Sequence, residues 1–139
     1  MSRIMIAGTG SGSGKTTIVC GLCRCIKDIG RTPTALKCGP DYIDAMFHSR
    51  VLKMRTGNLD SWFCDKTTIR TLLAKKEKSS DITVIEGVMG YYDGVGGIST
   101  KASAYDLADT TDTPVILVVN SRGMSISLAA YIKGFMEYK

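Results

Sequence analysis

Residues 8–17 of this chain read Gly8-Thr9-Gly10-Ser11-Gly12-Ser13-Gly14-Lys15-Thr16-Thr17. The segment follows a short β-branched stretch, residues 3–7, and opens a run with apolar residues at helical spacing, residues 15–29. A glycine-rich turn between a strand and a helix, closed by Gly-Lys-Thr, is typical of a loop that binds phosphate groups. The strict pattern has glycine at the position of Thr9, and here the glycine stands one residue earlier, at Gly8. We interpret this departure as the mark of a subgroup of such loops.

The chemistry of a phosphate loop assigns a task to each part of the segment. Glycines let backbone N–H groups turn inward around phosphate oxygens, and the helix N-terminus adds partial positive charge. Lys15 would reach the β- and γ-phosphates of a nucleotide, and Thr16 would offer its hydroxyl to Mg²⁺. ATP and Mg²⁺ are therefore the expected ligands. The residues expected to contact the nucleotide are Thr9, Gly10, Ser11, Gly12, Ser13, Gly14, Lys15, Thr16 and Thr17.

Apolar stretches and helical periods alternate along the whole chain. We predict strands at residues 3–7, 32–37, 82–86 and 114–119, and helices at residues 15–29, 45–52, 67–76, 100–109 and 124–138. The continuous apolar run of the last strand predicts burial on both of its faces. Residues 38–60 lack a clean period, so we expect a loop-rich insertion around the helix at 45–52. The predicted fold class is α/β, a three-layer parallel sheet flanked by helices, of the phosphate-loop NTPase type.

Acidic residues follow the third predicted strand. Glu86 ends it, at the edge of a parallel sheet where ligands collect, and a metal bound to ATP needs such a carboxylate beside Thr16. Asp93 lies seven residues further on and would position a metal or a substrate, although its Asp-Gly sequence suits a simple turn equally well. The expected metal ligands are Thr16, Asp41 and Glu86.

The second predicted strand ends in an unusual concentration of charge. Lys37 would add positive charge at a transferred phosphoryl group, and Asp41 and Asp44 would bind Mg²⁺ or orient an attacking nucleophile. A solvated loop is the alternative for each residue alone, and their clustering disfavours it. The expected catalytic residues are Lys15, Lys37, Asp41, Asp44 and Asp93.

Length and composition limit the choice of function. The chain has 139 residues, which suits one domain, and its 44% hydrophobic and 22% charged residues are ordinary for a globular protein, which excludes disorder. The longest apolar run, residues 114–119, is far shorter than the ~20 residues of a membrane span. The net charge of +5 allows nucleic acid, an anionic surface or a polyanionic small molecule as partner.

The cysteines indicate a reducing compartment. Five is an odd number, and the N-terminus leads into the glycine-rich loop rather than an export signal, so we expect free thiols and a cytoplasmic protein. Cys20, Cys23 and Cys25 lack the further ligands that a metal site needs, so we expect buried helix cysteines there. Cys38 has no base partner and is expected to be structural.

Several longer motifs resemble one family. They read Lys37-Cys-Gly-Pro-Asp-Tyr-Ile-Asp44 with Phe47-His48, Asn58-Leu-Asp-Ser-Trp62, Val84-Ile-Glu-Gly-Val-Met-Gly-Tyr-Tyr-Asp-Gly94, and Pro114-Val-Ile-Leu-Val-Val119 with Gly123-Met-Ser125. With the phosphate loop, they resemble the N-terminal ATP-dependent synthetase domain of cobyrinic acid a,c-diamide synthase, and dethiobiotin synthetase is similar in the wider group. The likeness runs through nearly the whole chain.

The resemblance implies an amide-forming ligase of cobalamin biosynthesis. ATP would phosphorylate an acetate carboxylate of a corrin-type polycarboxylate, and ammonia would then displace phosphate to leave amides at the a and c positions. Arg50, Lys53 and Arg55 would meet the substrate carboxylates or, as an alternative, form a solvated basic face. No nucleic acid or membrane partner is expected, and a homodimer is allowed.

Two departures from the family pattern limit the part of the reaction that we expect this chain to perform. Family members carry a glutaminase domain that makes ammonia, and the single histidine here, His48, lies inside a synthetase motif. We therefore expect residues 1–139 to be a partial synthetase domain that receives ammonia from a glutaminase domain outside this chain. Asn120 stands where an acid is usual, which puts any role at that position in doubt.

Two alternative functions stay open. A related tetrapyrrole, such as nickel sirohydrochlorin, would be amidated by the same chemistry. A regulatory ATPase of the partition or septum-site type shares the phosphate loop, but its members carry an extra lysine where this chain has Gly10.

Overall fold

The computed structural model describes residues 2–139, apart from the side chains of Tyr42, Asp44, Ala45 and His48. The strands are β1 (Ser2–Gly8), β2 (Pro33–Cys38), β3 (Arg55–Leu59), β4 (Ile82–Glu86) and β5 (Val115–Val118). The helices are α1 (Lys15–Asp28), α2 (Tyr42–Leu52), α3 (Lys66–Glu77), α4 (Ala104–Thr111) and α5 (Ser127–Glu137), with a 3₁₀ turn at Val95–Gly97. The predicted alternation of strand and helix is confirmed.

All strand pairs are parallel, and the sheet order is β3-β2-β4-β1-β5. Parallel strands bring their carboxyl ends to one edge, so the loops after β1, β2 and β4 meet there. The register pairs Lys37 of β2 with Glu86 of β4, and Glu86 with Ile6 of β1. The sheet therefore places the two charged strand ends side by side.

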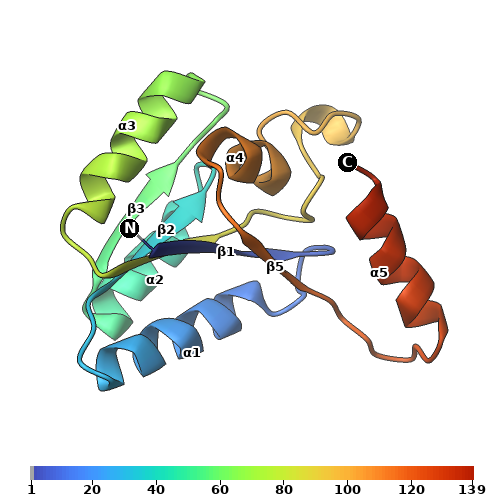
Figure 1. Cartoon of the computed structure of the whole chain (residues 1–139), viewed down its shortest axis with the longest axis horizontal. Coiled ribbons are helices and arrows are strands. Elements are labelled where there is room, and N and C mark those ends of the chain that lie inside the picture. The colour runs from blue at the N-terminus through green and yellow to red at the C-terminus, as the bar shows by residue number, and fades with distance from the viewer. Residues whose placement is uncertain (1) are drawn as a thin grey trace.

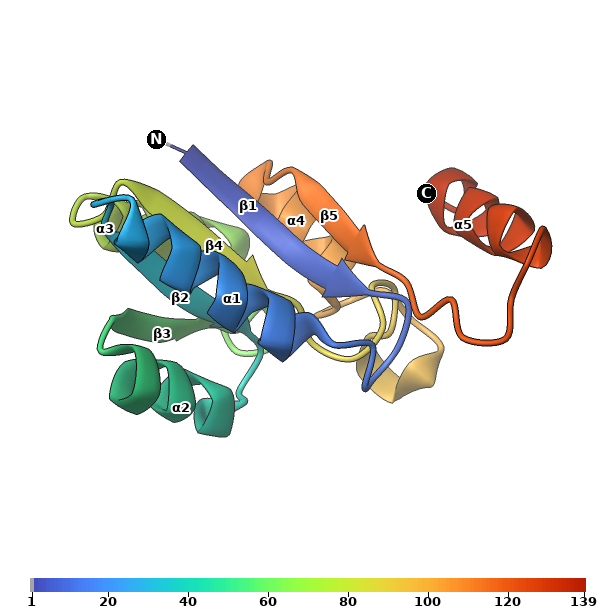
Figure 2. The ribbon, with the colours of Figure 1, turned by 90° about the horizontal axis from the view of Figure 1, so that it is seen from below.

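Helices cover both faces of the sheet, which confirms the predicted three layers (Figures 1 and 2). On one face α1 packs Val19, Cys23 and Ile26, at helical spacing, against Ile6 and Val84. On the other face, α3 and α4 cover the opposite side chains of the same strands. That cluster contains Met5, Leu36, Ile69, Leu73, Ile85, Leu107 and Ala108.

The predicted loop-rich insertion contains a strand that the sequence pattern missed. β3 pairs with β2 over its whole length, although Leu59 is its only buried residue and Gly57 lies in its middle. A strand with so little apolar content forms because its neighbour supplies a hydrogen-bonding edge, which outweighs local propensity. The sheet thus has five strands, not the four that we predicted.

The predicted burial of the last strand is wrong. β5 is an edge strand, and Ile116 is 49% exposed. A continuous apolar run is buried only where packed layers cover both faces of its strand. β5 pairs with β1 along one edge, and its side chains stay partly exposed. α5 lies apart from the sheet in both views, at the end of an extended connection (Figures 1 and 2). Over the described residues, no helix has the length and apolarity needed to cross a membrane.

The contrast between central and edge strands gives a stability prediction. Ile85→Ala should lower the free energy of unfolding by about 2–5 kcal/mol, because Ile85 is fully buried in β4 and its removal leaves a cavity. Ile116→Ala, the same substitution in the edge strand, should cost about 1 kcal/mol or less. Urea unfolding followed by circular dichroism measures both. Equal losses for the two variants would contradict the edge position of β5.

Candidate functional site

The glycine-rich loop wraps from the end of β1 to the start of α1. Gly12 and Gly14 have positive φ angles of 73° and 96°, which favour glycine, and a Cβ at either position would meet no atom within 4 Å. The space beside the loop is therefore open. α1 begins without a side-chain cap and without an acidic residue in its first turn, so its first N–H groups can face an anion.

Lys15 folds back across this loop. Its side chain is buried, and Nζ donates to the carbonyl oxygens of Gly10 at 2.9 Å and Met89 at 2.6 Å. Met89 belongs to the segment after β4 and has a φ of 45°, an uncommon conformation for a side chain of its size. The Lys15 ammonium thus links the glycine-rich loop to the segment after β4 through these two hydrogen bonds.

Glu86, Thr16 and Lys37 form the centre of the site. The Thr16 hydroxyl donates to Glu86 Oε1 at 2.6 Å, and Lys37 Nζ donates to the same oxygen at 2.9 Å. Glu86 and Lys37 are both buried. A buried carboxylate is tolerated because a cation and a hydroxyl bind its Oε1.

Asp41 completes the group on the solvent side. Its carboxylate lies 3.8 Å from Lys37 Nζ and also caps α2 by accepting from the Ile43 amide at 3.1 Å. These side chains and the glycine-rich loop line a cavity of about 380 Å³. Its lining residues are Ser11, Gly12, Ser13, Gly14, Lys15, Thr16, Thr17, Lys37, Asp41, Glu86, Val88 and Met89.

Several predicted site residues lie elsewhere. Asp93 accepts from the Gly90 amide at 2.9 Å, as an Asp-Gly turn would, and lines a neighbouring cavity instead. The side chain of Asp44 lies outside the described residues. Arg50 and Lys53 stand at the end of α2, and Arg55 begins β3, so all three lie at the opposite edge of the sheet from the loop.

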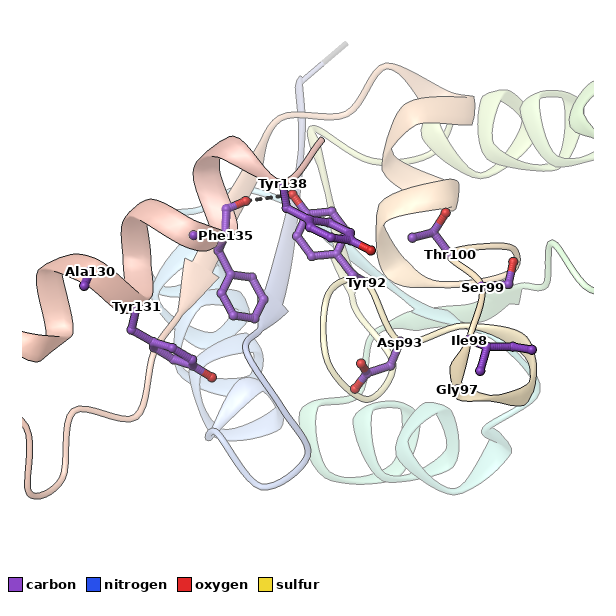
Figure 3. A pocket seen from close by; sticks show the side chains of 11 residues that line it. Tyr92, Asp93, Gly97, Ile98, Ser99, Thr100, Ala130, Tyr131, Phe135 and Tyr138 are labelled. Carbon is purple, nitrogen blue, oxygen red and sulfur yellow. Dashed lines mark hydrogen bonds between the residues drawn. The ribbon is translucent and has the colours of Figure 1, made fainter.

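The cavity at Asp93 is lined by four aromatic rings among other side chains and measures about 520 Å³. Figure 3 shows Tyr131 and Phe135 of α5 facing Tyr92 and Asp93. The Tyr92 hydroxyl donates to the Phe135 carbonyl at 2.7 Å, and the two rings stack with centroids 5.7 Å apart. This aromatic contact attaches α5 to the segment after β4, and no charged side chain other than Asp93 lines the cavity among the described residues.

Asn58 has a structural task that sequence reasoning did not assign. Its side-chain amide donates to the carbonyl oxygens of Gly39 at 2.9 Å and Asp41 at 3.0 Å, and so fixes the turn that carries Asp41. The available signal was the Asn58 to Trp62 motif, which we used for the family resemblance alone. Without β3 in the prediction, nothing indicated that this motif lies beside the end of β2.

The five cysteines are free thiols. The predicted burial of the helix cysteines is confirmed for Cys23 alone, because Cys25 lies on the exposed face of α1 and Cys20 is partly buried. Burial raises the pKa of Cys23 and that of Cys38 to about 12, so both are protonated at neutral pH and unfit as nucleophiles. Among the described residues, no group of three or more His, Cys, Asp or Glu side chains is placed to hold a metal ion. The predicted Mg²⁺ ligands are of another kind, a hydroxyl with two carboxylates.

Comparison with known proteins shows which family this chain resembles along most of its length. The family model described as the CobQ/CobB/MinD/ParA nucleotide binding domain matches residues 4–122. The chain is 40% identical over 136 residues to the cobyrinate a,c-diamide synthase of Priestia megaterium, covering 98% of this chain and 30% of the relative. It is 45% identical over 136 residues to the enzyme of that name from Thermoplasma volcanium, with the same coverage. For Methanococcus maripaludis the identity is 43% over 138 residues, covering 99% of this chain and 31% of the relative. The chain therefore spans about 30% of the length of these relatives.

Thiol reactivity should divide the cysteines by burial. At pH 8 the exposed Cys25 should react with Ellman's reagent at once, whereas Cys23 and Cys38 should react only on unfolding. A pKa of about 12, against the ordinary 9.0, lowers their thiolate fraction about a thousandfold. Mass mapping of the modified peptides, with Cys25→Ser as the control, makes the measurement. Rapid modification of Cys38 in the folded chain would count against its burial.

Removing the cation beside Glu86 should be costly. Lys37→Ala leaves a buried carboxylate without its ammonium partner and should lower the free energy of unfolding by about 3–5 kcal/mol. Arg24→Ala is the control, because it breaks an exposed ion pair with Asp28 and should cost less than about 1 kcal/mol. Chemical denaturation measures both. A loss at Lys37 as small as that at Arg24 would show that Glu86 is not held by this pair.

Proposed function

The chain belongs to the CobQ/CobB/MinD/ParA nucleotide binding domain family, and from that membership we propose that it is the ATP-binding part of an amide-forming ligase. Its substrate in this proposal is a corrin-type polycarboxylate, amidated at its a- and c-acetate groups. The observation that carries the proposal is the likeness, at 40% identity or more over at least 98% of the chain, to cobyrinate a,c-diamide synthases.

The chemical groups of the site fit the binding of a nucleoside triphosphate together with a divalent cation. The open loop and the uncapped start of α1 offer backbone N–H groups to phosphate oxygens. The Thr16 hydroxyl and the carboxylates of Asp41 and Glu86 are the oxygen ligands that Mg²⁺ prefers. Bound there, Mg²⁺ would neutralise phosphate charge. Thr16 donates its proton to Glu86, and the lone pairs of the hydroxyl oxygen remain to bind a metal ion.

Phosphoryl transfer then needs positioning and charge more than covalent work by the protein. A substrate carboxylate oxygen attacks the γ-phosphorus, the bond to ADP breaks, and an acyl phosphate forms. In this proposal the Lys15 ammonium leaves the carbonyl oxygens of Gly10 and Met89 and binds phosphate oxygens instead. A hydrogen bond to a charged phosphate is stronger than one to a neutral carbonyl. Lys37, held by Glu86, supplies fixed positive charge beside the transferred group.

The second half-reaction replaces phosphate by nitrogen. Ammonia attacks the acyl carbon, phosphate leaves with the bonding pair, and the proton lost by nitrogen passes to phosphate or water. An acyl phosphate makes this step feasible, because a free carboxylate is a poor acylating agent. We propose that Asp41 and Asp44 orient the reacting groups, and that Asp93 acts on them from the neighbouring cavity that it lines. The ammonia would come from a glutaminase domain that is not part of these 139 residues.

A regulatory ATPase of the partition type is the second candidate, because the matching family description includes MinD and ParA. Gly10 stands where such proteins would carry an extra lysine, and the Lys37 to Asp44 motif favours the ligase. The same chemistry on nickel sirohydrochlorin is a variant of the first candidate.

Turnover with free ammonia tests the proposal. The chain incubated with ATP, Mg²⁺, ammonium chloride and cobyrinic acid should release ADP and convert carboxylates to amides, seen as successive mass changes. Lys15→Ala should lower nucleotide affinity by calorimetry at least tenfold, since its charge-assisted phosphate contacts are lost. It serves as the inactive control.

One outcome would contradict the ligase, and another would change only its substrate. ATP hydrolysis that DNA stimulates and cobyrinic acid does not affect would favour the partition-type candidate. Amidation of nickel sirohydrochlorin in preference to cobyrinic acid would move the substrate to the other tetrapyrrole.

A further inference from the structure

The segment that follows β3 forms a cavity that the phosphate chemistry does not use. It measures about 470 Å³ and lies between the start of α3 on one side and α4 with the segment before it on the other. Its lining residues are Ser61, Trp62, Phe63, Cys64, Asp65, Lys66, Ile69, Lys101, Asp106 and Thr110. The cavity contains the end of the Asn58 to Trp62 motif.

Two neighbouring aromatic side chains are exposed at this cavity. Trp62 is 53% and Phe63 is 76% exposed, although burying either ring would stabilise a protein by about 1.5–3 kcal/mol. Their segment is held in place by Asp60, whose carboxylate accepts from the Trp62 amide at 2.9 Å and whose carbonyl accepts from Cys64 at 3.0 Å. The rings are therefore presented on a fixed turn, at the sheet edge where ligands bind.

Two lysines flank the rings. Lys66 is 65% exposed and lies 3.9 Å from the carboxylate of Asp109, a distant ion pair, and Lys101 is exposed as well. Asp65 and Asp106 also line the cavity. Asp65 accepts from the Thr68 amide at 2.7 Å, and Asp106 accepts from the Ala102 amide at 2.8 Å. Each carboxylate accepts from a backbone donor through one oxygen, which fixes its position but leaves its charge. The ammonium groups stand on long flexible stems and can turn toward an anionic ligand.

The cavity is connected to the phosphate site through β3. Asn58, four residues before Trp62, binds the carbonyl oxygens of Gly39 and Asp41, and the Gly39 amide donates to the Leu59 carbonyl at 2.9 Å. Asp41 lines the phosphate cavity. One strand end thus fixes both the acidic turn of the phosphate site and the aromatic turn of this second cavity.

We propose that this cavity binds the ring of the second substrate, a rigid conjugated macrocycle that bears several carboxylates, an inference that rests on the proposed function. The ring face lies on Trp62 and Phe63, and Lys66 and Lys101 pair with peripheral carboxylates. Another acetate group extends over the end of β3 toward Asp41. The aromatic cavity at Tyr92 fits a polycarboxylate less well, because Asp93 is the single charged side chain that lines it among the described residues.

Calorimetric titration of the whole chain with cobyrinic acid tests this assignment. Trp62→Ala should weaken binding about tenfold, because a stacking ring is lost, and the double variant Lys66→Ala/Lys101→Ala should weaken it to a similar extent. Binding by the double variant should also depend less on salt concentration. Affinity for a non-hydrolysable ATP analogue should be unchanged in both.

Two matched control variants test whether the loss of binding is specific to this cavity. Lys75→Ala/Lys78→Ala removes the same charge from the far end of α3 and should bind cobyrinic acid like the wild type. Tyr131→Ala removes a ring from the Tyr92 cavity and should do the same. Circular dichroism establishes folding for each variant, and Trp62→Phe, which keeps a flat ring, should restore most of the affinity.

The outcomes of the titration distinguish failure of this cavity assignment from failure of the proposed substrate. If wild type binds cobyrinic acid and the Trp62 and lysine variants bind it equally well, the cavity is wrongly assigned while the proposed function stands. If Tyr131→Ala weakens binding instead, the ring lies in the Tyr92 cavity. If the wild-type chain binds the ATP analogue but not cobyrinic acid, the inference and the proposed substrate class fail together.

Discussion

The carboxylate of Glu86 is the point on which the site depends. It is fully buried, and one of its oxygens accepts from both Thr16 and Lys37. Thr16 comes from α1, Lys37 from β2 and Glu86 from β4, so these two polar contacts join three elements. A buried charge of this kind is stable only with its partners in place. The start of α1 and the ends of β2 and β4 are therefore held in one arrangement before any ligand arrives.

The segment after β4 ties this centre to the rest of the sheet edge. Lys15 holds its start through the Met89 carbonyl, and the Gly90 amide binds Asp93. Tyr92 then attaches α5 through Phe135. The positive φ of Met89 is an uncommon conformation, and such a conformation persists where the surrounding contacts impose it. The nucleotide loop and the aromatic cavity thus share one short, well-anchored segment.

Family membership explains the scaffold, whereas the loops after β2 and β3 distinguish its uses. A phosphate loop on a parallel sheet serves many reactions, so it says little about the second substrate. In this chain, the loop after β2 carries Asp41, and the loop after β3 carries Trp62. Asn58 joins the two loops by its paired hydrogen bonds. The specific chemistry of the proposed ligase is therefore concentrated on the β2–β3 side of the sheet.

Local sequence was sufficient to predict the parts of the molecule whose structure follows from the type and spacing of neighbouring residues. The glycine-rich loop, the strands β1, β2 and β4, and the position of Glu86 at a strand end all follow from residue type and spacing. The three-layer parallel architecture follows from the alternation of strand and helix. Periodicity failed at β3, whose five residues contain a single buried apolar side chain, because its stability comes from β2.

Tertiary structure alone decided which of these residues meet. The register of β2 on β4 puts Lys37 beside Glu86, and no spacing along the chain specifies a register between strands that are 49 residues apart at this contact. The same holds for Asn58 and Asp41, which approach because β3 lies next to β2. Burial of β5 also depends on what covers its outer side. Residue types therefore specified the chemical groups of this protein, and long-range packing specified their neighbours.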